Sequence, residues 1–184
     1  ASVQNGLNWF QLYMFRDRGI VHELIQRAST AGYHALMVTV DTPVAGRRER
    51  DVRFGVTLPP RIGLQTIMDG IRHPRWTWSF VRSEPILFSN LLGHFSADGA
   101  TPVALADYMN SQFDPSVTWK DVEWLRKSWE GPLIIKGILT TNDARLAADY
   151  GFDAIVLSNH GGRQLDNTVS PLHLVVPVVD ALGD

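Results

Sequence analysis

A histidine and an arginine follow an apolar run near the end of the chain. The run Asp153–Ser158 is predicted to be a strand. His160 follows it, and a Gly-Gly pair separates His160 from Arg163. A neutral imidazole accepts a proton, and a guanidinium grips a carboxylate with two hydrogen bonds. Ser158 and His160 are two residues apart, so they are expected to point the same way while the chain stays extended. The segment therefore predicts a base and a carboxylate clamp at the mouth of a strand. A surface loop that happens to hold both residues is the alternative.

Two charged residues at the ends of other apolar runs could complete this chemistry. Asp41 follows the run Tyr33–Val40. A carboxylate beside an imidazole fixes its tautomer and stabilises the imidazolium, so we predict that Asp41 pairs with His160. Lys136 ends the run Leu133–Lys136, where a lysine is costly unless it meets an anion. The electron-rich edge of a reduced flavin is one such anion, and the alternative is a lysine that extends to solvent at the rim.

Polar residues also alternate on the first two predicted strands. Gln11 and Tyr13 share one side of the strand Asn8–Tyr13, and Thr39 repeats the pattern before Asp41. Glutamine offers a donor and an acceptor, which suits the imide edge of a flavin ring, and the tyrosine hydroxyl can bind a substrate oxygen. The alternative is a polar layer inside a barrel.

Together, these residues match the oxidation of a 2-hydroxy acid. They supply a base, its orienting acid, a carboxylate clamp, and a cation plus an amide for a planar cofactor. The sequence contains no serine nucleophile elbow, so hydrolysis is not predicted. The other histidines lack the spacing of metal ligands, and no metal is expected; they are His22, His34, His73, His94 and His173.

Strands and helices alternate along most of the chain. Apolar spacing predicts a helix over 17–31, and Thr118 with an acid three residues later predicts the start of a helix that runs to Trp129. Two more helices are predicted, from Thr141 to Gly151 and from Ser170-Pro171 onward, where Pro177 is expected to kink or shorten the last one. This alternation with short connections predicts a parallel α/β sheet.

The polar residues sit at the ends of four strands, which favours a TIM (β/α)8 barrel. A doubly wound sheet competes, but no glycine-rich fingerprint follows the first strand. A barrel needs eight strands. We therefore expect residues 1–184 to form one partial barrel domain, the central portion of a barrel with about four βα units and a long inserted loop at about 55–116.

The inserted loop holds a stretch, residues 61–82, that combines apolar, aromatic and basic residues. Ile62, Ile67, Met68 and Ile71 have helical spacing, and arginines and tryptophans follow. Such a composition suits a membrane surface. The alternatives are an excursion packed on its own barrel or a lid over the site.

Composition excludes several classes of protein. The chain has no cysteine, which excludes disulfides, iron–sulfur clusters, thiolate zinc sites and covalently attached haem. The net charge of −2, with no basic run longer than Arg47-Arg48, argues against a nucleic-acid partner. No apolar run approaches the ~18 residues that span a bilayer, and Ala1–Gly6 does not have the pattern of a signal peptide. Both ends are expected to have been cut from a longer protein.

The motifs resemble those of a known family. The run Ser158-Asn-His-Gly-Gly-Arg-Gln-Leu-Asp166 is similar to the active-site signature of the FMN-dependent 2-hydroxy acid dehydrogenases and oxidases, such as glycolate oxidase and flavocytochrome b2. Trp9–Tyr13, Thr39–Pro43, Gly46–Asp51 and Ile134–Gly137 match further family blocks in the same order.

The resemblance implies a role for each matching residue. FMN would be contacted by Gln11, Thr39, Lys136 and Ser158. Tyr13, Arg48 and Arg163 would bind the substrate, and His160 would act as the base with Asp41 behind it, Tyr13 also taking part in catalysis. The implied reaction is oxidation of an (S)-2-hydroxy acid, L-lactate first, with the electrons passing to the flavin and then to a quinone or cytochrome of the respiratory chain.

His73–Trp78 and Phe113–Trp124 resemble the membrane-associated bacterial L-lactate and (S)-mandelate dehydrogenases. That resemblance implies a peripheral position on the cytoplasmic side of the inner membrane, with a cytoplasmic location as the alternative, and a homo-oligomer for the full-length protein. (S)-Mandelate dehydrogenase and an oxidase that uses oxygen are the alternative activities. The 184 residues alone are expected to bind FMN weakly or not at all, so a non-catalytic half-barrel is the alternative of another class.

Overall fold

The computed structural model describes residues 6–44, 46, 49–54, 63–83, 90, 108 and 110–183. The chain divides into two compact units. The first, called the sheet unit, combines Ala1–Arg47 with Gln112–Asp184, and the second, called the inserted unit, is Arg48–Ser111.

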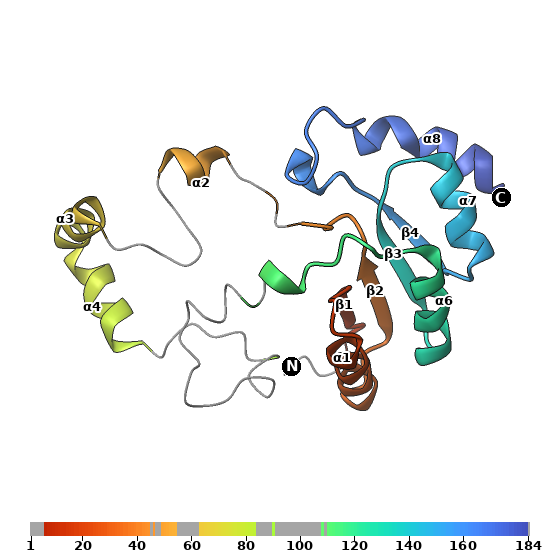
Figure 1. Cartoon of the computed structure of the whole chain (residues 1–184), viewed down its shortest axis with the longest axis horizontal. Coiled ribbons are helices and arrows are strands. Elements are labelled where there is room, and N and C mark those ends of the chain that lie inside the picture. Colours follow the sequence, from red (N-terminus) through yellow and green to blue (C-terminus); the bar gives the residue numbers. More distant parts are fainter. Residues whose placement is uncertain are drawn as a thin grey trace. The chain divides into compact units, whose positions relative to one another are not determined.

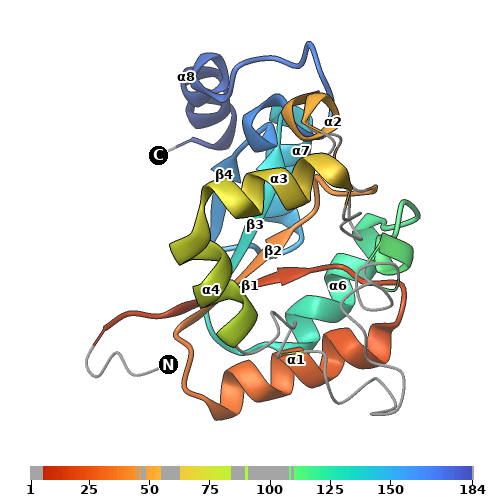
Figure 2. The ribbon, with the colours of Figure 1, turned by 90° about the vertical axis from the view of Figure 1, so that its left-hand side faces the viewer.

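The sheet unit is built on four parallel strands. They are β1 (Trp9–Tyr13), β2 (Ala35–Thr39), β3 (Leu133–Ile138) and β4 (Ala154–Leu157). Figure 2 shows them side by side in chain order, β1-β2-β3-β4. A doubly wound sheet reverses its strand order at a switch point, whereas a barrel keeps chain order throughout. The predicted parallel α/β sheet is confirmed, and its order is that of a barrel.

Helices follow the strands and cover one side of the sheet (Figure 1). They are α1 (Arg18–Thr30), α6 (Trp119–Ser128), α7 (Thr141–Asp149) and α8 (Pro171–Leu182). The apolar face predicted for α1 is buried in full. The predicted capping box of α6 is present between Thr118 and Asp121. The starts of α1 and α6 are therefore capped by side chains, Asp17 for α1 and the Thr118–Asp121 pair for α6.

The strand register separates an apolar face from a polar one. Tyr13 is paired with Thr39, Thr39 with Lys136, and Lys136 with Val156. Because side chains alternate along a strand, this row lies on one face. The neighbouring row lies on the other face and is buried beneath the helices; it contains Leu12, Val38 and Ile135. The core thus lies between sheet and helices, and the polar row faces away from it.

Several element ends differ from the sequence-based expectation. β3 continues past Lys136 to Ile138, and β4 ends at Leu157. α8 includes Pro177 and runs on to Leu182, so the proline does not shorten it.

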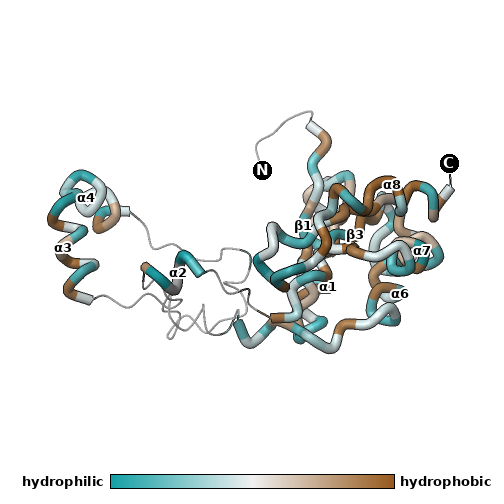
Figure 3. The backbone as a smooth tube through the Cα atoms, turned by 90° about the horizontal axis from the view of Figure 1, so that it is seen from above, coloured by the Kyte–Doolittle hydropathy of each residue, from teal (hydrophilic) through white to brown (hydrophobic). Residues whose placement is uncertain are grey.

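The described part of the inserted unit includes α2 (Glu49–Arg53), α3 (Leu64–Arg72) and α4 (Pro74–Arg82). α3 and α4 pack against each other where Thr77 Oγ1 donates to the carbonyl of Gly70 at 2.7 Å. Apolar and polar residues alternate along both helices (Figure 3). Their large apolar side chains are exposed in the structure: Leu64, Ile67, Met68, Ile71, Trp76, Trp78, Phe80 and Val81.

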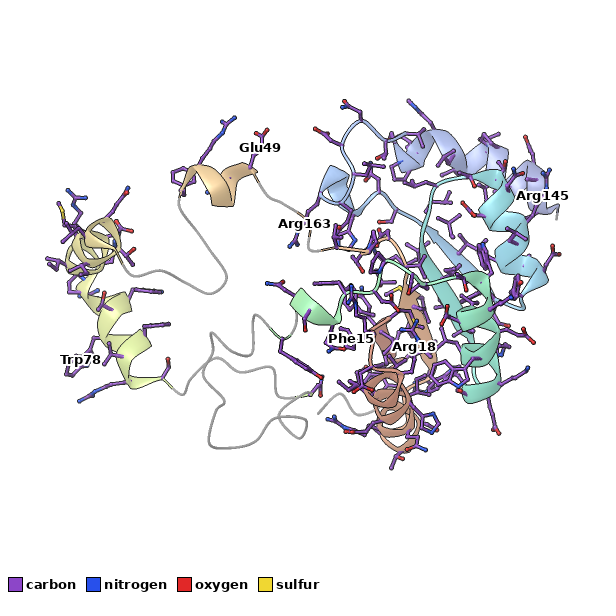
Figure 4. All side chains as sticks on the ribbon, in the orientation of Figure 1. Phe15, Arg18, Glu49, Trp78, Arg145 and Arg163 are labelled. Atoms are coloured by element: carbon purple, nitrogen blue, oxygen red, sulfur yellow. The ribbon has the colours of Figure 1, made fainter. Side chains whose placement is uncertain are left out.

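Arg18 ties the start of α1 to the segment that re-enters the sheet unit (Figure 4). Its Nη2 lies 2.7 Å from Asp114 Oδ2 and 2.9 Å from Asp121 Oδ1, and its Nη1 donates to the carbonyl of Phe15. Asp114 is 8% exposed and also accepts hydrogen bonds from Ser116. The side-chain hydrogen bond from Ser116, against the effect of burial and with further help from Arg18, lowers the pKa of Asp114.

Asp114→Asn is expected to reduce the free energy of unfolding of the full-length protein by about 1–3 kcal/mol at pH 7, because charge-assisted hydrogen bonds are lost. The folded-state pKa of Asp114 is lowered, so its stabilising contribution is present above the unfolded pKa, about 3.9, and is lost as the pH falls through the folded value. Urea unfolding should therefore show a smaller deficit at pH 3 than at pH 7. Asp149→Asn, at an exposed carboxylate of α7, is the control. Equal deficits at both pH values would contradict this role for the charge.

Candidate active site

The carboxylate of Asp41, just beyond the end of β2, lies between two basic groups. Its Oδ1 lies 2.9 Å from His160 Nδ1, and its Oδ2 lies 3.7 Å from Lys136 Nζ. The side chain of Asp41 is only 9% exposed. The predicted contact between Asp41 and His160 is therefore present, and Lys136 joins the same carboxylate from the neighbouring strand.

This contact assigns the tautomer of His160. A carboxylate can only accept a hydrogen bond, so Nδ1 must carry the proton that lies between the two groups. In the neutral ring, Nε2 is then the unprotonated nitrogen. His160 can therefore accept a proton at Nε2, and Asp41 stabilises the cation that results.

Ser158 connects Lys136 and His160 to the end of β4. Its Oγ accepts hydrogen bonds from Lys136 Nζ and from the backbone N–H of His160, each at 3.1 Å. The lysine is thus held by a hydroxyl and a carboxylate, which compensates its partial burial. It does not extend freely to solvent.

The chain turns sharply after Ser158. Asn159 Oδ1 accepts from the N–H groups of Gly161 and Gly162, and His160 has a φ of 57° in the left-handed region. The expectation that Ser158 and His160 share an extended segment is wrong, because the asparagine closes a turn between them. The turn aims the imidazole at Asp41. Sequence reasoning missed Asn159, although an asparagine before two glycines is a recognisable turn signal.

A second polar group lies on β1 and β2. Gln11 Nε2 donates to Thr39 Oγ1 at 2.8 Å and lies 3.4 Å from the hydroxyl of Tyr13. Thr39 is 1% exposed, whereas Gln11 is exposed on the polar face of the sheet. The buried hydroxyl therefore orients an amide that remains free to contact a ligand.

Arg163 and Arg48 were both predicted to bind the substrate, and the structure describes only the first of them. Arg163 is exposed on the loop after β4 (Figure 4), and its guanidinium has no hydrogen-bond or ion-pair partner among the described residues. Its backbone lies against the loop after β2, since a side chain at Gly46 would meet the carbonyl oxygen of Arg163 at 2.9 Å. Sequence reasoning assigned no role to this glycine. Arg48 lies outside the described residues.

Four parallel strands in chain order, with a polar cluster at their carboxyl ends, have the arrangement of part of a (β/α)8 barrel. The model of one family, FMN-dependent dehydrogenase, matches residues 1–184. The chain belongs to that family.

Relatives in the family carry related names. An L-lactate dehydrogenase of Stenotrophomonas maltophilia is 45% identical over 96% of this chain, and one of Ectopseudomonas mendocina is 43% identical over 95%. The chain spans about 46% of the length of each of these relatives.

Solved structures agree with the barrel assignment. The crystal structure of the monotopic membrane protein (S)-mandelate dehydrogenase matches 96% of this chain and 46% of its own, with a TM-score of 0.87 and 36% identity. A mutant flavocytochrome b2 with pyruvate bound matches 98% of this chain and 34% of its own, with a TM-score of 0.66 and 32% identity. The four strands and their helices are therefore part of a larger TIM-barrel architecture.

Asp41→Asn is expected to weaken the tautomer preference of His160, because an amide can donate as well as accept and no longer requires a proton on Nδ1. Side-chain 15N chemical shifts of His160 in the full-length protein, measured at a pH where the ring is neutral, report the fraction protonated at Nδ1. That fraction should fall in the variant, while the exposed His22 on α1 should not change. An unchanged His160 spectrum would show that Asp41 does not control the ring.

Proposed function

We propose that the full-length protein oxidises an (S)-2-hydroxy acid, most simply L-lactate, to the 2-oxo acid with FMN as cofactor. The observation that carries the proposal is the hydrogen bond between Asp41 and His160, which leaves His160 Nε2 as a base on the polar side of the sheet. The family and the L-lactate dehydrogenase relatives support the same reaction.

The residues present fit a flavin. The polar face of the sheet presents the exposed amide of Gln11, which the buried hydroxyl of Thr39 orients, together with the hydroxyl of Ser158 and the ammonium of Lys136. An amide that donates and accepts suits the imide edge of the ring, and a cation favours the electron-rich reduced form. These four residues are proposed to hold FMN, which when bound supplies the acceptor for two electrons.

Each remaining residue has a defined task in the proposal. Arg163, with Tyr13, binds the substrate carboxylate and fixes the hydroxyl-bearing carbon near His160. His160 Nε2 takes one proton from the substrate, and Asp41 stabilises the imidazolium. In the net reaction the substrate loses its C–H and O–H hydrogens and two electrons: His160 takes one hydrogen as a proton, the electron pair and the equivalent of the other hydrogen pass to bound FMN, and the carbon becomes the carbonyl carbon of the 2-oxo acid. Arg48 is proposed as a second cation for the substrate.

The variant His160→Gln of the full-length protein is expected to reduce the rate of flavin bleaching by about 10²–10⁴-fold, because it removes a positioned base. Stopped-flow absorbance with L-lactate, (S)-mandelate and glycolate measures the rate and ranks the substrates. His22→Gln, at an exposed histidine of α1, is the matched control and should bleach normally. A His160 variant that bleaches at the wild-type rate would refute the assignment of the base.

Oxygen uptake compared with quinone reduction distinguishes an oxidase from a dehydrogenase.

We also propose that α3 and α4 attach the protein to a membrane surface. None of the helices in the described ranges is long and apolar enough to cross a bilayer. Trp76 and Trp78 are each more than 60% exposed, and Arg82 lies over the Trp78 ring at 4.2 Å. Exposed aromatic side chains beside arginines suit the interface between lipid headgroups and acyl chains. The monotopic (S)-mandelate dehydrogenase supports this position at the membrane.

Arg75→Glu on α4 is expected to lower the fraction of the full-length protein that sediments with vesicles containing anionic lipid, by several-fold at low salt, because each cation near such a surface contributes about 1 kcal/mol. Arg145→Glu on α7 makes the same change of charge at another exposed arginine and should leave sedimentation unchanged. Equal losses in the two variants would point to net charge rather than to α4.

For the 184 residues taken alone, a non-catalytic half-barrel is the second candidate. α8 leaves Leu172, Val176 and Val179 largely exposed, and an apolar face of this kind normally packs against another element. Flavin absorbance and gel filtration of the 184-residue chain separate the two candidates. A bound yellow chromophore favours the enzyme, and a colourless oligomer favours the half-barrel.

A further inference from the structure

Gly137 interrupts the regular pairing of β3 with β4. Lys136 is paired with Val156, but Ile138 is paired with the very next residue, Leu157. Gly137 is therefore an extra residue on β3, and its φ of +111° lies where L side chains are strained. The bulge lies directly after the lysine of the candidate active site.

The missing side chain at Gly137 leaves room for Asp41. A Cβ at this position would lie 2.6 Å from Asp41 Cβ and 2.8 Å from its Cγ, and 3.0 Å from its backbone nitrogen. Carbon atoms in contact normally lie about 3.5–4.0 Å apart. Because the Cβ of a residue is fixed by its own backbone, rotation of the Asp41 side chain cannot relieve the closest contact. One of the two strand ends would have to move by about 1 Å.

We infer that Gly137 is a positioning residue for the reaction: its bulge lets Asp41 come close enough to hold both His160 and Lys136. The inference rests on the proposed function, in which Asp41 orients the base. The contact of 2.9 Å with His160 and the separation of 3.7 Å from Lys136 both depend on where Asp41 sits. A shift of 1 Å breaks the first of these contacts.

A second glycine provides a control that distinguishes the positioning role of Gly137 from the effect of backbone strain alone. Gly32, at the end of α1, also has a positive φ, +73°, but a Cβ there would meet nothing within 4 Å. Gly32→Ala therefore imposes a strained backbone without any approach to the site. It is the matched control for Gly137→Ala.

Crystal structures of the full-length variants test the position of Asp41 whether or not the proposed activity is found. In Gly137→Ala, the distance from Asp41 Oδ1 to His160 Nδ1 should exceed 3.5 Å, and in Gly32→Ala it should stay near 2.9 Å. An unchanged distance in Gly137→Ala overturns the inference. If this variant does not fold, Gly137→Ala combined with Asp41→Gly removes the closest contacts and should fold. A double variant that also fails to fold overturns the inference as well.

Kinetics then test the effect on the reaction. Gly137→Ala is expected to lower the rate of flavin reduction by about 10²-fold, as a misplacement of 1 Å can do, and Gly32→Ala should leave it near wild type. If Gly137 acts through Asp41, adding Gly137→Ala to Asp41→Asn should lower the rate by no more than about twofold further. Additive losses overturn the positioning role. A wild-type protein that reduces no flavin with any 2-hydroxy acid refutes the proposed function and leaves the structural test to decide the position of Asp41.

Discussion

The carboxylate of Asp41 is the group on which the candidate site depends. It is mostly buried, and a buried carboxylate is tolerated only when cations or hydrogen-bond donors surround it. Here His160 supplies a hydrogen bond at one oxygen and Lys136 supplies a charge near the other. The same carboxylate thus orients His160, the proposed base, and holds Lys136, the cation proposed to contact the flavin. Proton removal and electron acceptance therefore share one electrostatic centre.

Parallel strand register brings these groups together. Thr39 and Lys136 are directly paired, so the residues that follow them leave the sheet at the same edge. Asp41 and Ser158 come from β2 and β4, on either side of β3, and both contact Lys136. Three consecutive strands therefore contribute to one polar cluster, although 117 residue numbers separate Asp41 from Ser158. Lys136 lies within β3, and Asp41 and Ser158 lie within two residues of the ends of β2 and β4, so rigid strands anchor the cluster.

The sequence predicted the strands and the parallel sheet, because short apolar runs alternate with segments of helical spacing. It predicted the contact between Asp41 and His160, because a carboxylate beside an imidazole fixes its tautomer and stabilises the imidazolium. It did not predict the turn at Asn159 or the bulge at Gly137. Both features depend on single backbone angles. A glycine or an asparagine indicates that unusual backbone angles are allowed at that position, but it does not indicate which angle is adopted. Of the two outcomes expected for Pro177, the structure excludes a shortened helix, because α8 continues past it to Leu182.

Two segments of the sheet unit that flank the inserted unit in the sequence are held by contacts within the sheet unit itself. On the way out, the backbone of Gly46 lies against Arg163. On the way back, Gln112 and Asp114 are bound by the backbone of Arg16 and by the guanidinium of Arg18. The strand ends that carry Asp41 and His160 are thus supported by contacts within the sheet unit itself.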